Sequence, residues 1–272
     1  MSAAVEPLQA ATRTMPATPA HDPLLVFDRV EITLGGRLIV EPTSFSVGRG
    51  EFVCIVGPSG CGKTTMLRAA GGLARPGAGE VRLAGRPVTG PSREVAIVFQ
   101  DYGRALLPWR TAEGNVALAL EAANVPKVEH AVRIAAVLAK VGLAAHAQKF
   151  PAQLSGGMQQ RLQIARCLAQ EPMLLMMDEP FGALDALTRQ GLQDEVATLV
   201  RERGISALFV THDLEEALYL GDRVIALLPN PGRIARTLEV TLPRPRHQLT
   251  TREDPAFLRM RRELFDFIQE AH

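Results

Sequence analysis

The chain carries several short, nearly continuous apolar runs that alternate with longer mixed segments. These runs are FVCIV at 52–56, VAIVFQ at 95–100, MLLMMD at 173–178, ALFVT at 207–211 and RVIALL at 223–228. Apolar runs of this length are typical of strands buried on both faces of a parallel sheet. Helix-length segments separate most of them, so the pattern predicts an α/β domain with a mainly parallel sheet.

Two regions follow a different pattern. Residues 24–51 contain short β-rich pieces broken by pairs of glycines, which predicts an antiparallel β subdomain. After residue 100 the sequence is helical for about seventy residues, and we predict an inserted helical subdomain at about 101–170. One helix should begin near Pro126, and its expected apolar face comprises Ala131, Ile134, Leu138 and Val141.

The two ends of the chain differ from this central part, for which we predict one domain at 23–244. Residues 1–22 are rich in Ala, Thr and Pro, lack the pattern of a secretory signal, and are expected to form a disordered extension. Residues 245–272 are expected to form a C-terminal helical tail. A helical stripe in this tail predicts a packing face, made of Phe257, Met260, Leu264 and Phe267.

The composition argues against several functional classes. The 30 Lys and Arg residues nearly balance the 29 Asp and Glu residues, so no strong net field favours a nucleic acid partner. Three cysteines, Cys54, Cys61 and Cys167, predict reduced thiols in a cytosolic protein. No apolar stretch approaches the roughly 18 residues of a spanning helix, so we expect any membrane role to depend on a partner.

One glycine-rich segment, GPSGCGKTT, fits the G-x-x-x-x-G-K-[ST] pattern between a predicted strand and a predicted helix. Its backbone N–H groups and the helix N-terminus would bind phosphate oxygens. Lys63 would reach the β- and γ-phosphates, and the Thr64 hydroxyl would bind Mg²⁺. The alternative is a glycine-rich turn that matches by chance. We call this segment the phosphate loop; it comprises Gly57, Pro58, Ser59, Gly60, Cys61, Gly62, Lys63, Thr64 and Thr65.

Two acidic residues follow the apolar run at 173–178, at the carboxyl end of a predicted strand. Ligands collect at this edge of α/β sheets. Asp178 would hold Mg²⁺ through water, and Glu179 would act as the general base toward an attacking water. An acidic helix cap is the alternative interpretation of this pair.

A second phosphate-binding pattern lies in LSGGMQQRLQIARCLA at 154–169. The hydroxyl of Ser155 and the amides of Gly156 and Gly157 precede a run of good helix formers. The simpler interpretation is a serine-capped amphipathic helix, with one face formed by Met158, Leu162, Ala165 and Ala169.

With these motifs, nearly the whole chain after residue 24 resembles the ATPase subunits of ATP-binding cassette (ABC) transporters. The resemblance implies a P-loop NTPase core, ATP and Mg²⁺ as ligands, and a homodimer. In that family a signature segment, here LSGGM at 154–158, binds the γ-phosphate of ATP held by a second copy of the domain. Met158 departs from the glutamine that is usual there, but Ser155, Gly156 and Gly157 keep the phosphate-binding groups.

The resemblance also assigns roles to four further positions. Gln100 matches the glutamine that senses Mg²⁺ and the attacking water, and Asp185 matches a loop that crosses the dimer interface. His212 matches the histidine that contacts the γ-phosphate, beside Lys63 and Glu179 among the catalytic residues. Leu34 stands where the family usually has an aromatic residue that stacks on adenine, which puts some selectivity for ATP in doubt.

Within the family, the strings ALLPW (105–109), FPAQLSGGMQQR, MMDEPFGALDALTR, NPGRI and LPRPR resemble importers of nitrate, sulfonates and taurine. This implies an integral-membrane permease as partner, an indirect periplasmic or extracellular solute-binding protein, and a peripheral location at the cytoplasmic face of the inner membrane. Trp109 would contact the permease or belong to the helical core, and the two interpretations are about even.

Two rival functions remain at the level of sequence. A soluble ABC ATPase acting on nucleic acid or the ribosome would need a coiled-coil insertion or a second cassette, and the residues between Lys63 and Ser155 are too few for the insertion. A P-loop small-molecule kinase would leave the signature segment and His212 unexplained.

Overall fold

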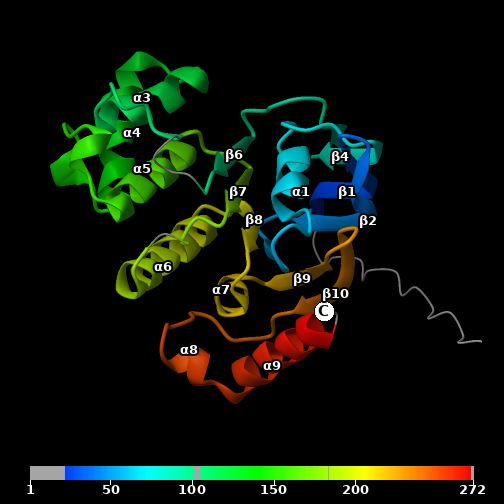
Figure 1. Ribbon diagram of the computed structural model, residues 1–272. Helices are drawn as coiled ribbons and strands as arrows, with labels where there is room; N and C mark the ends of the chain where they lie inside the picture. The colour runs from blue at the N-terminus through cyan, green and yellow to red at the C-terminus, as the bar shows by residue number, and fades with distance from the viewer. Residues whose placement is uncertain (1–21, 101–104, 183, 271–272) are drawn as a thin grey trace, which may run out of the picture.

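The computed structural model describes residues 22–100, 105–182 and 184–270 (Figure 1). The extension predicted at 1–22 lies outside the described residues, apart from Asp22, as do the first four residues of the predicted helical subdomain.

A six-stranded sheet forms the centre of the molecule. Its strands follow the order β10-β9-β3-β8-β7-β6, and all neighbours are parallel except β9 and β10. The predicted parallel sheet is therefore confirmed, with one antiparallel strand at an edge. The strands are β3 (Phe52–Val56), β6 (Val95–Val98), β7 (Leu174–Asp178), β8 (Ser206–Thr211), β9 (Arg223–Leu228) and β10 (Arg233–Glu239).

Side chains of this sheet alternate between two apolar cores, because successive residues of a strand face opposite sides. From β3, Val53 and Ile55 join the core that contains helix α1 (Lys63–Ala70), whereas Cys54 and Val56 join the core on the opposite face. Burial on both faces explains why the strands are continuous apolar runs.

A second, four-stranded sheet is antiparallel, in the order β2-β1-β4-β5, as the sequence predicted for its first two strands. Helix α1 packs against β1 as well as β7 and β8, so it lies between the two sheets (Figure 1). The strands are β1 (Pro23–Leu34), β2 (Arg37–Gly48), β4 (Ala78–Leu83) and β5 (Arg86–Pro87).

A buried ion pair joins the end of the antiparallel sheet to the central sheet. Glu51, just before β3, accepts hydrogen bonds from Arg223 Nε at 2.8 Å and Nη2 at 2.9 Å. Both side chains are less than a tenth exposed. Arg223 Nη2 also donates to the Ser46 carbonyl oxygen at 2.6 Å, so the pair fixes β2 against β9.

The helical region stands to one side of the central sheet (Figure 1). It contains α3 (Ala112–Ala122), α4 (Lys127–Lys140), the short 3₁₀ helices η1 (Ala144–His146) and η2 (Pro151–Gln153), and α5 (Gly156–Ala169).

One detail of the predicted face of α4 is wrong. Leu138 and Val141 are buried and Ile134 is partly buried, but Ala131 is exposed. Val137 is buried instead, because only the C-terminal half of α4 is packed and its N-terminal half faces solvent.

The C-terminal part covers the face of the central sheet opposite α1 with α6 (Ala186–Glu202), α7 (Leu214–Leu220) and α9 (Pro255–Glu270), and α8 (Thr250–Glu253) packs against α7 and α9. The predicted stripe of α9 is confirmed as a packing face: Phe257 and Leu264 are fully buried, Met260 is nearly so, and Phe267 packs against the same core. Within the described residues, the structure has no helix whose length and apolar character would let it cross a membrane.

Candidate functional site

The phosphate loop follows β3 and leads into α1, and its glycines are required by space as well as by backbone conformation. Gly57 has φ 155°, and a Cβ there would lie 2.5 Å from the Leu227 carbonyl oxygen. Gly62 has φ 95°, and a Cβ there would lie 2.5 Å from Val40 Cγ2. A larger residue at either position would displace the loop from the strands behind it.

Lys63 is nearly buried at the first position of α1. Its Nζ donates to the carbonyl oxygens of Gly57 at 2.8 Å and Pro58 at 3.0 Å, so the ammonium lies across the loop. Ser59 and Gly60 are exposed at the tip. The loop therefore has the backbone shape and the positive charge that a phosphate group needs.

The three cysteines are unpaired thiols buried in the two cores. Burial raises the pKa of Cys54 and of Cys61, and raises the pKa of Cys167 to about 12. Cys61 points away from the surface of the phosphate loop, so only its backbone can contribute to binding.

Asp178 lies at the carboxyl end of β7, beside the start of α1. The Thr64 hydroxyl donates to Asp178 Oδ1 at 3.1 Å. Burial raises the pKa of Asp178, and Glu179 adds to this, while the Thr64 hydrogen bond opposes it. A nearby cation would favour the ionised carboxylate and so lower this pKa.

The Thr64 hydroxyl and the Asp178 carboxylate are better suited to Mg²⁺ than to a metal ion whose ligands all come from the protein. Among the described residues, no group of three or more His, Cys, Asp or Glu side chains could hold a metal ion. Mg²⁺ is commonly held by one or two carboxylates while it keeps waters and substrate phosphates as its other ligands. The Thr64 and Asp178 oxygens match that mode of binding.

Glu179 brings together two other predicted residues. Its Oε2 accepts a hydrogen bond from Gln100 Nε2 at 3.3 Å and lies 3.2 Å from His212 Nδ1. Glu179 adopts a left-handed backbone with φ 44°, which is strained for a residue with a side chain. Gln100 follows β6 and His212 follows β8, the two neighbours of β7. Three adjacent strands thus deliver an amide, a carboxylate and an imidazole to one point.

The signature segment lies at the start of α5, in the helical region and apart from α1 (Figure 1). Ser155 is the N-cap, and its Oγ accepts from the Met158 N–H at 3.4 Å. A Cβ on Gly157 would lie 2.9 Å from Thr188 Cγ2 in α6. Asp185 caps that helix by accepting from the Thr188 N–H at 3.0 Å. The exposed Ser155 and Asp185 therefore belong to two helix N-termini packed against each other.

Leu34 ends β1 and is 52% exposed. The hairpin that carries it packs against the phosphate loop, since Val40 of β2 limits the space at Gly62. Phe27, an aromatic residue on the same strand, is buried and stacks on Phe45 with ring centroids 4.4 Å apart. Phe27 therefore cannot contact a bound ligand.

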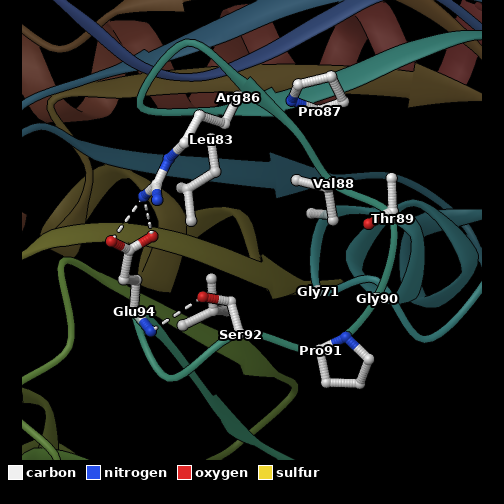
Figure 2. A pocket seen from close by; sticks show the side chains of 12 residues that line it. Gly71, Leu83, Arg86, Pro87, Val88, Thr89, Gly90, Pro91, Ser92 and Glu94 are labelled. Atoms are coloured by element: carbon white, nitrogen blue, oxygen red, sulfur yellow. Dashed lines mark hydrogen bonds and ion pairs between the residues drawn. The ribbon is translucent and has the colours of Figure 1, made fainter.

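A surface pocket of about 270 Å³ lies beside β5, away from these residues (Figure 2). Arg86 Nη2 donates to both carboxylate oxygens of Glu94, at 2.7 and 2.6 Å, across its mouth. The guanidinium is thereby already paired, and no predicted site residue lines the pocket.

The loop around His212 is held by two residues that no sequence motif predicted. Glu216 is buried and accepts from the Thr211 hydroxyl at 2.7 Å and from Gln193 Nε2 at 3.0 Å. Asp213 caps α7 by accepting from the N–H groups of Glu215 at 2.8 Å and Glu216 at 3.2 Å. The signal available in the sequence was the set of three acids, Asp213, Glu215 and Glu216, among the four residues after His212.

Known proteins resemble this chain in sequence and in fold. A protein-family model described as ABC transporter matches residues 40–182. The aliphatic sulfonates import ATP-binding protein SsuB 2 of Burkholderia cenocepacia is 43% identical over 97% of this chain and 94% of its own length. A dimeric ATP-binding cassette, solved in a post-hydrolysis state with ADP and Pi, aligns with a TM-score of 0.69 and 32% identity, covering 79% of this chain and 98% of that one.

The nitrate import ATP-binding protein NrtC of Synechococcus elongatus is 45% identical over 87% of this chain. The match spans only 36% of that relative, so the chain corresponds to about a third of its length.

Proposed function

The chain belongs to the ABC transporter family, and from that premise we propose that two copies of it bind and hydrolyse ATP to drive a membrane importer. The observation that carries the proposal is the meeting of Gln100 and His212 on one carboxylate oxygen of Glu179, beside the Thr64–Asp178 pair. An amide, a base and an imidazole next to a phosphate loop form a set of groups suited to hydrolysis of a γ-phosphate.

Each residue has a distinct role in this proposal. The phosphate loop binds the triphosphate through its N–H groups, and Lys63 neutralises the β- and γ-phosphates. Glu179 accepts the proton of the attacking water, because its carboxylate lies at the open carboxyl edge of the sheet. Gln100 and His212 hold that carboxylate from either side, and His212, which is 63% exposed, also reaches the γ-phosphate.

Thr64 and Asp178 would hold Mg²⁺, with Gln100 beside them. When bound, Mg²⁺ neutralises charge on the phosphate oxygens. The raised pKa of Asp178 supports this assignment, because a cation beside a buried carboxylate offsets the cost of burying its charge.

The phosphate loop and the signature segment lie apart in one copy of the chain, so two copies are needed to bring both to one nucleotide. Ser155, Gly156 and Gly157 open α5 in the helical region, while the phosphate loop opens α1 between the sheets (Figure 1). We propose that the signature segment of one copy covers the nucleotide on the phosphate loop of the other. Asp185 would cross the same interface, since its helix packs against Gly157.

The importer assignment rests on the relatives, whose names state import of aliphatic sulfonates and of nitrate. We propose that this chain serves a permease for a small solute of that class, such as nitrate, a sulfonate or taurine, supplied by a periplasmic or extracellular solute-binding protein. It would work as a peripheral subunit at the cytoplasmic face of the inner membrane.

Trp109 is 71% exposed, so the interpretation of this residue as part of the helical core is wrong. Its segment runs beside Phe150, which is 43% exposed, because the Ala112 N–H donates to the Lys149 carbonyl oxygen at 2.8 Å. Exposed aromatic side chains of this kind favour a protein contact, and we propose that this surface receives the permease.

Vesicles test the importer assignment directly. The chain is reconstituted with its permease and solute-binding protein, and uptake of labelled nitrate, taurine and an alkanesulfonate is measured with ATP inside. We expect ATP-dependent uptake of one of these solutes, and none when Lys63→Ala replaces the parent chain. ATP hydrolysis without uptake of any of the three would contradict the solute class.

A further inference from the structure

The loop that carries His212 is fixed to the first turn of α7. The Asp213 N–H donates to Thr211 Oγ1 at 3.0 Å, and the Thr211 hydroxyl donates to buried Glu216. Asp213 in turn caps the helix. His212 therefore lies between two residues that are each bonded to α7, so its position depends on where that first turn is held.

Two arginines from the C-terminal tail bind this same turn through Glu215. Arg252 Nη1 of α8 lies 2.7 Å from Glu215 Oε2, and Arg261 Nη1 of α9 lies 2.7 Å from Glu215 Oε1. Arg252 is further held over the Tyr219 ring, 5.3 Å from its centroid, and donates to Gln193 Oε1 at 3.3 Å. Each carboxylate oxygen thus has its own cation, from a different helix.

A cleft of about 820 Å³ lies between α7 and α9, with His212 on one wall and Arg262, Phe265 and Asp266 on the other. The side chain of Glu215 bridges this cleft to Arg261. Helix α9 packs on the core through fully buried Phe257 and Leu264, and this packing holds Arg261 in place.

We propose that Glu215, Arg252 and Arg261 form a clamp by which the C-terminal tail positions His212 for ATP hydrolysis. The inference rests on the proposed role of His212. Glu215 is a positioning residue: it lies three positions beyond His212 and acts through the first turn of α7. These ion pairs are partly exposed to solvent. Such pairs contribute little to folding stability, so their loss should alter the placement of His212 rather than the fold.

Single substitutions test the clamp better than truncation, because removal of α9 would also remove Phe257 and Leu264 from the core. The variants are Glu215→Gln, Arg261→Gln and the two combined. Arg262→Gln is the matched control, since its side chain is 83% exposed and pairs with Asp266 on the same helix. ATP turnover, KM for ATP and Tm are measured for the full chain.

We expect Glu215→Gln to lower kcat about three- to tenfold, because small misplacements of a group in a site reduce turnover. KM and Tm should remain near the parent values, and Arg262→Gln should match the parent in all three. The combined variant should equal Glu215→Gln, since both changes remove the same contact. Parent-like kcat in Glu215→Gln, losses that multiply in the combined variant, or a fall in Tm that accounts for the lost activity would each overturn the clamp.

His212→Ala separates this inference from the proposed function. If His212→Ala abolishes turnover while Glu215→Gln leaves kcat unchanged, the clamp is wrong and the role of His212 stands. If His212→Ala hydrolyses ATP like the parent, the proposed role of His212 fails, and the clamp with it.

Discussion

Replacing Glu179 with glutamine keeps the shape of the side chain but removes its ability to accept a proton. The new amide oxygen can still accept from Gln100 Nε2, which lies 3.3 Å from Glu179 Oε2. The pairing with His212 at 3.2 Å is weakened, but that imidazole is 63% exposed, so the contact contributes little to folding. Removing the charge also relieves repulsion with Asp178, whose pKa Glu179 helps to raise.

The expected loss therefore falls on turnover alone. A positioned general base contributes about 10²- to 10⁴-fold in rate, which corresponds to about 3–5.5 kcal/mol of barrier at 1.36 kcal/mol for each factor of ten. Steady-state phosphate release measures kcat, and a binding titration measures ATP affinity, which should stay within about twofold of the parent. Glu179→Gln should also accumulate as an ATP-bound dimer in size-exclusion chromatography. Turnover within about threefold of the parent would refute the assignment of the base.

Three further substitutions test other parts of the account. Leu34→Tyr should tighten ATP binding by about 1 kcal/mol through stacking on the base; an unchanged affinity in a titration would mean that this hairpin does not contact the base. Trp109→Ala should leave Tm unchanged, because the side chain is 71% exposed, and should weaken sedimentation with permease-containing vesicles. A fall in Tm with normal sedimentation would contradict the docking surface. Arg223→Met should lower the free energy of unfolding by about 3–5 kcal/mol in urea, because the buried carboxylate of Glu51 loses its cation and keeps, among the described residues, just the Gly48 N–H as a donor. A loss below about 1 kcal/mol would show that the pair does not join the two sheets as described.

The apolar pattern predicted the architecture well because strands buried on both faces must be continuous apolar runs. Each of the five parallel strands came from such a run, and the phosphate loop and the Asp178–Glu179 pair lie at strand ends where the pattern placed them. The spacing of residues along the chain is sufficient to predict such strands and loops, because their residues follow one another in the sequence.

Burial of single residues was less predictable, since it depends on contacts between distant segments. Trp109 could have been core or surface, and only the fold shows it exposed. Ala131 belongs to a good helical periodicity, yet neighbouring helices cover a face that is rotated toward Val137. The clamp at Glu215 joins residues 37 and 46 positions apart, and charged residues in a tail carry no local signal of such a partner.

The central claim is that each ATP lies between the phosphate loop of one copy and the signature segment of the other. Lys63→Ala should disable the phosphate loop, and Ser155→Arg should block the signature segment with a bulky side chain. Each variant alone should fail to dimerise with ATP, because every composite site then contains one damaged half.

Mixing the two variants tests the claim most directly. In the mixed dimer, the intact phosphate loop of the Ser155→Arg chain faces the intact signature segment of the Lys63→Ala chain, so one site is whole. The measurement is ATP-dependent dimerisation of differently labelled chains. We predict that dimers return only on mixing and only with ATP. If cross-linking shows that mixed dimers can form but ATP does not increase their amount, the shared site is contradicted, and LSGGM is only the start of a capped helix.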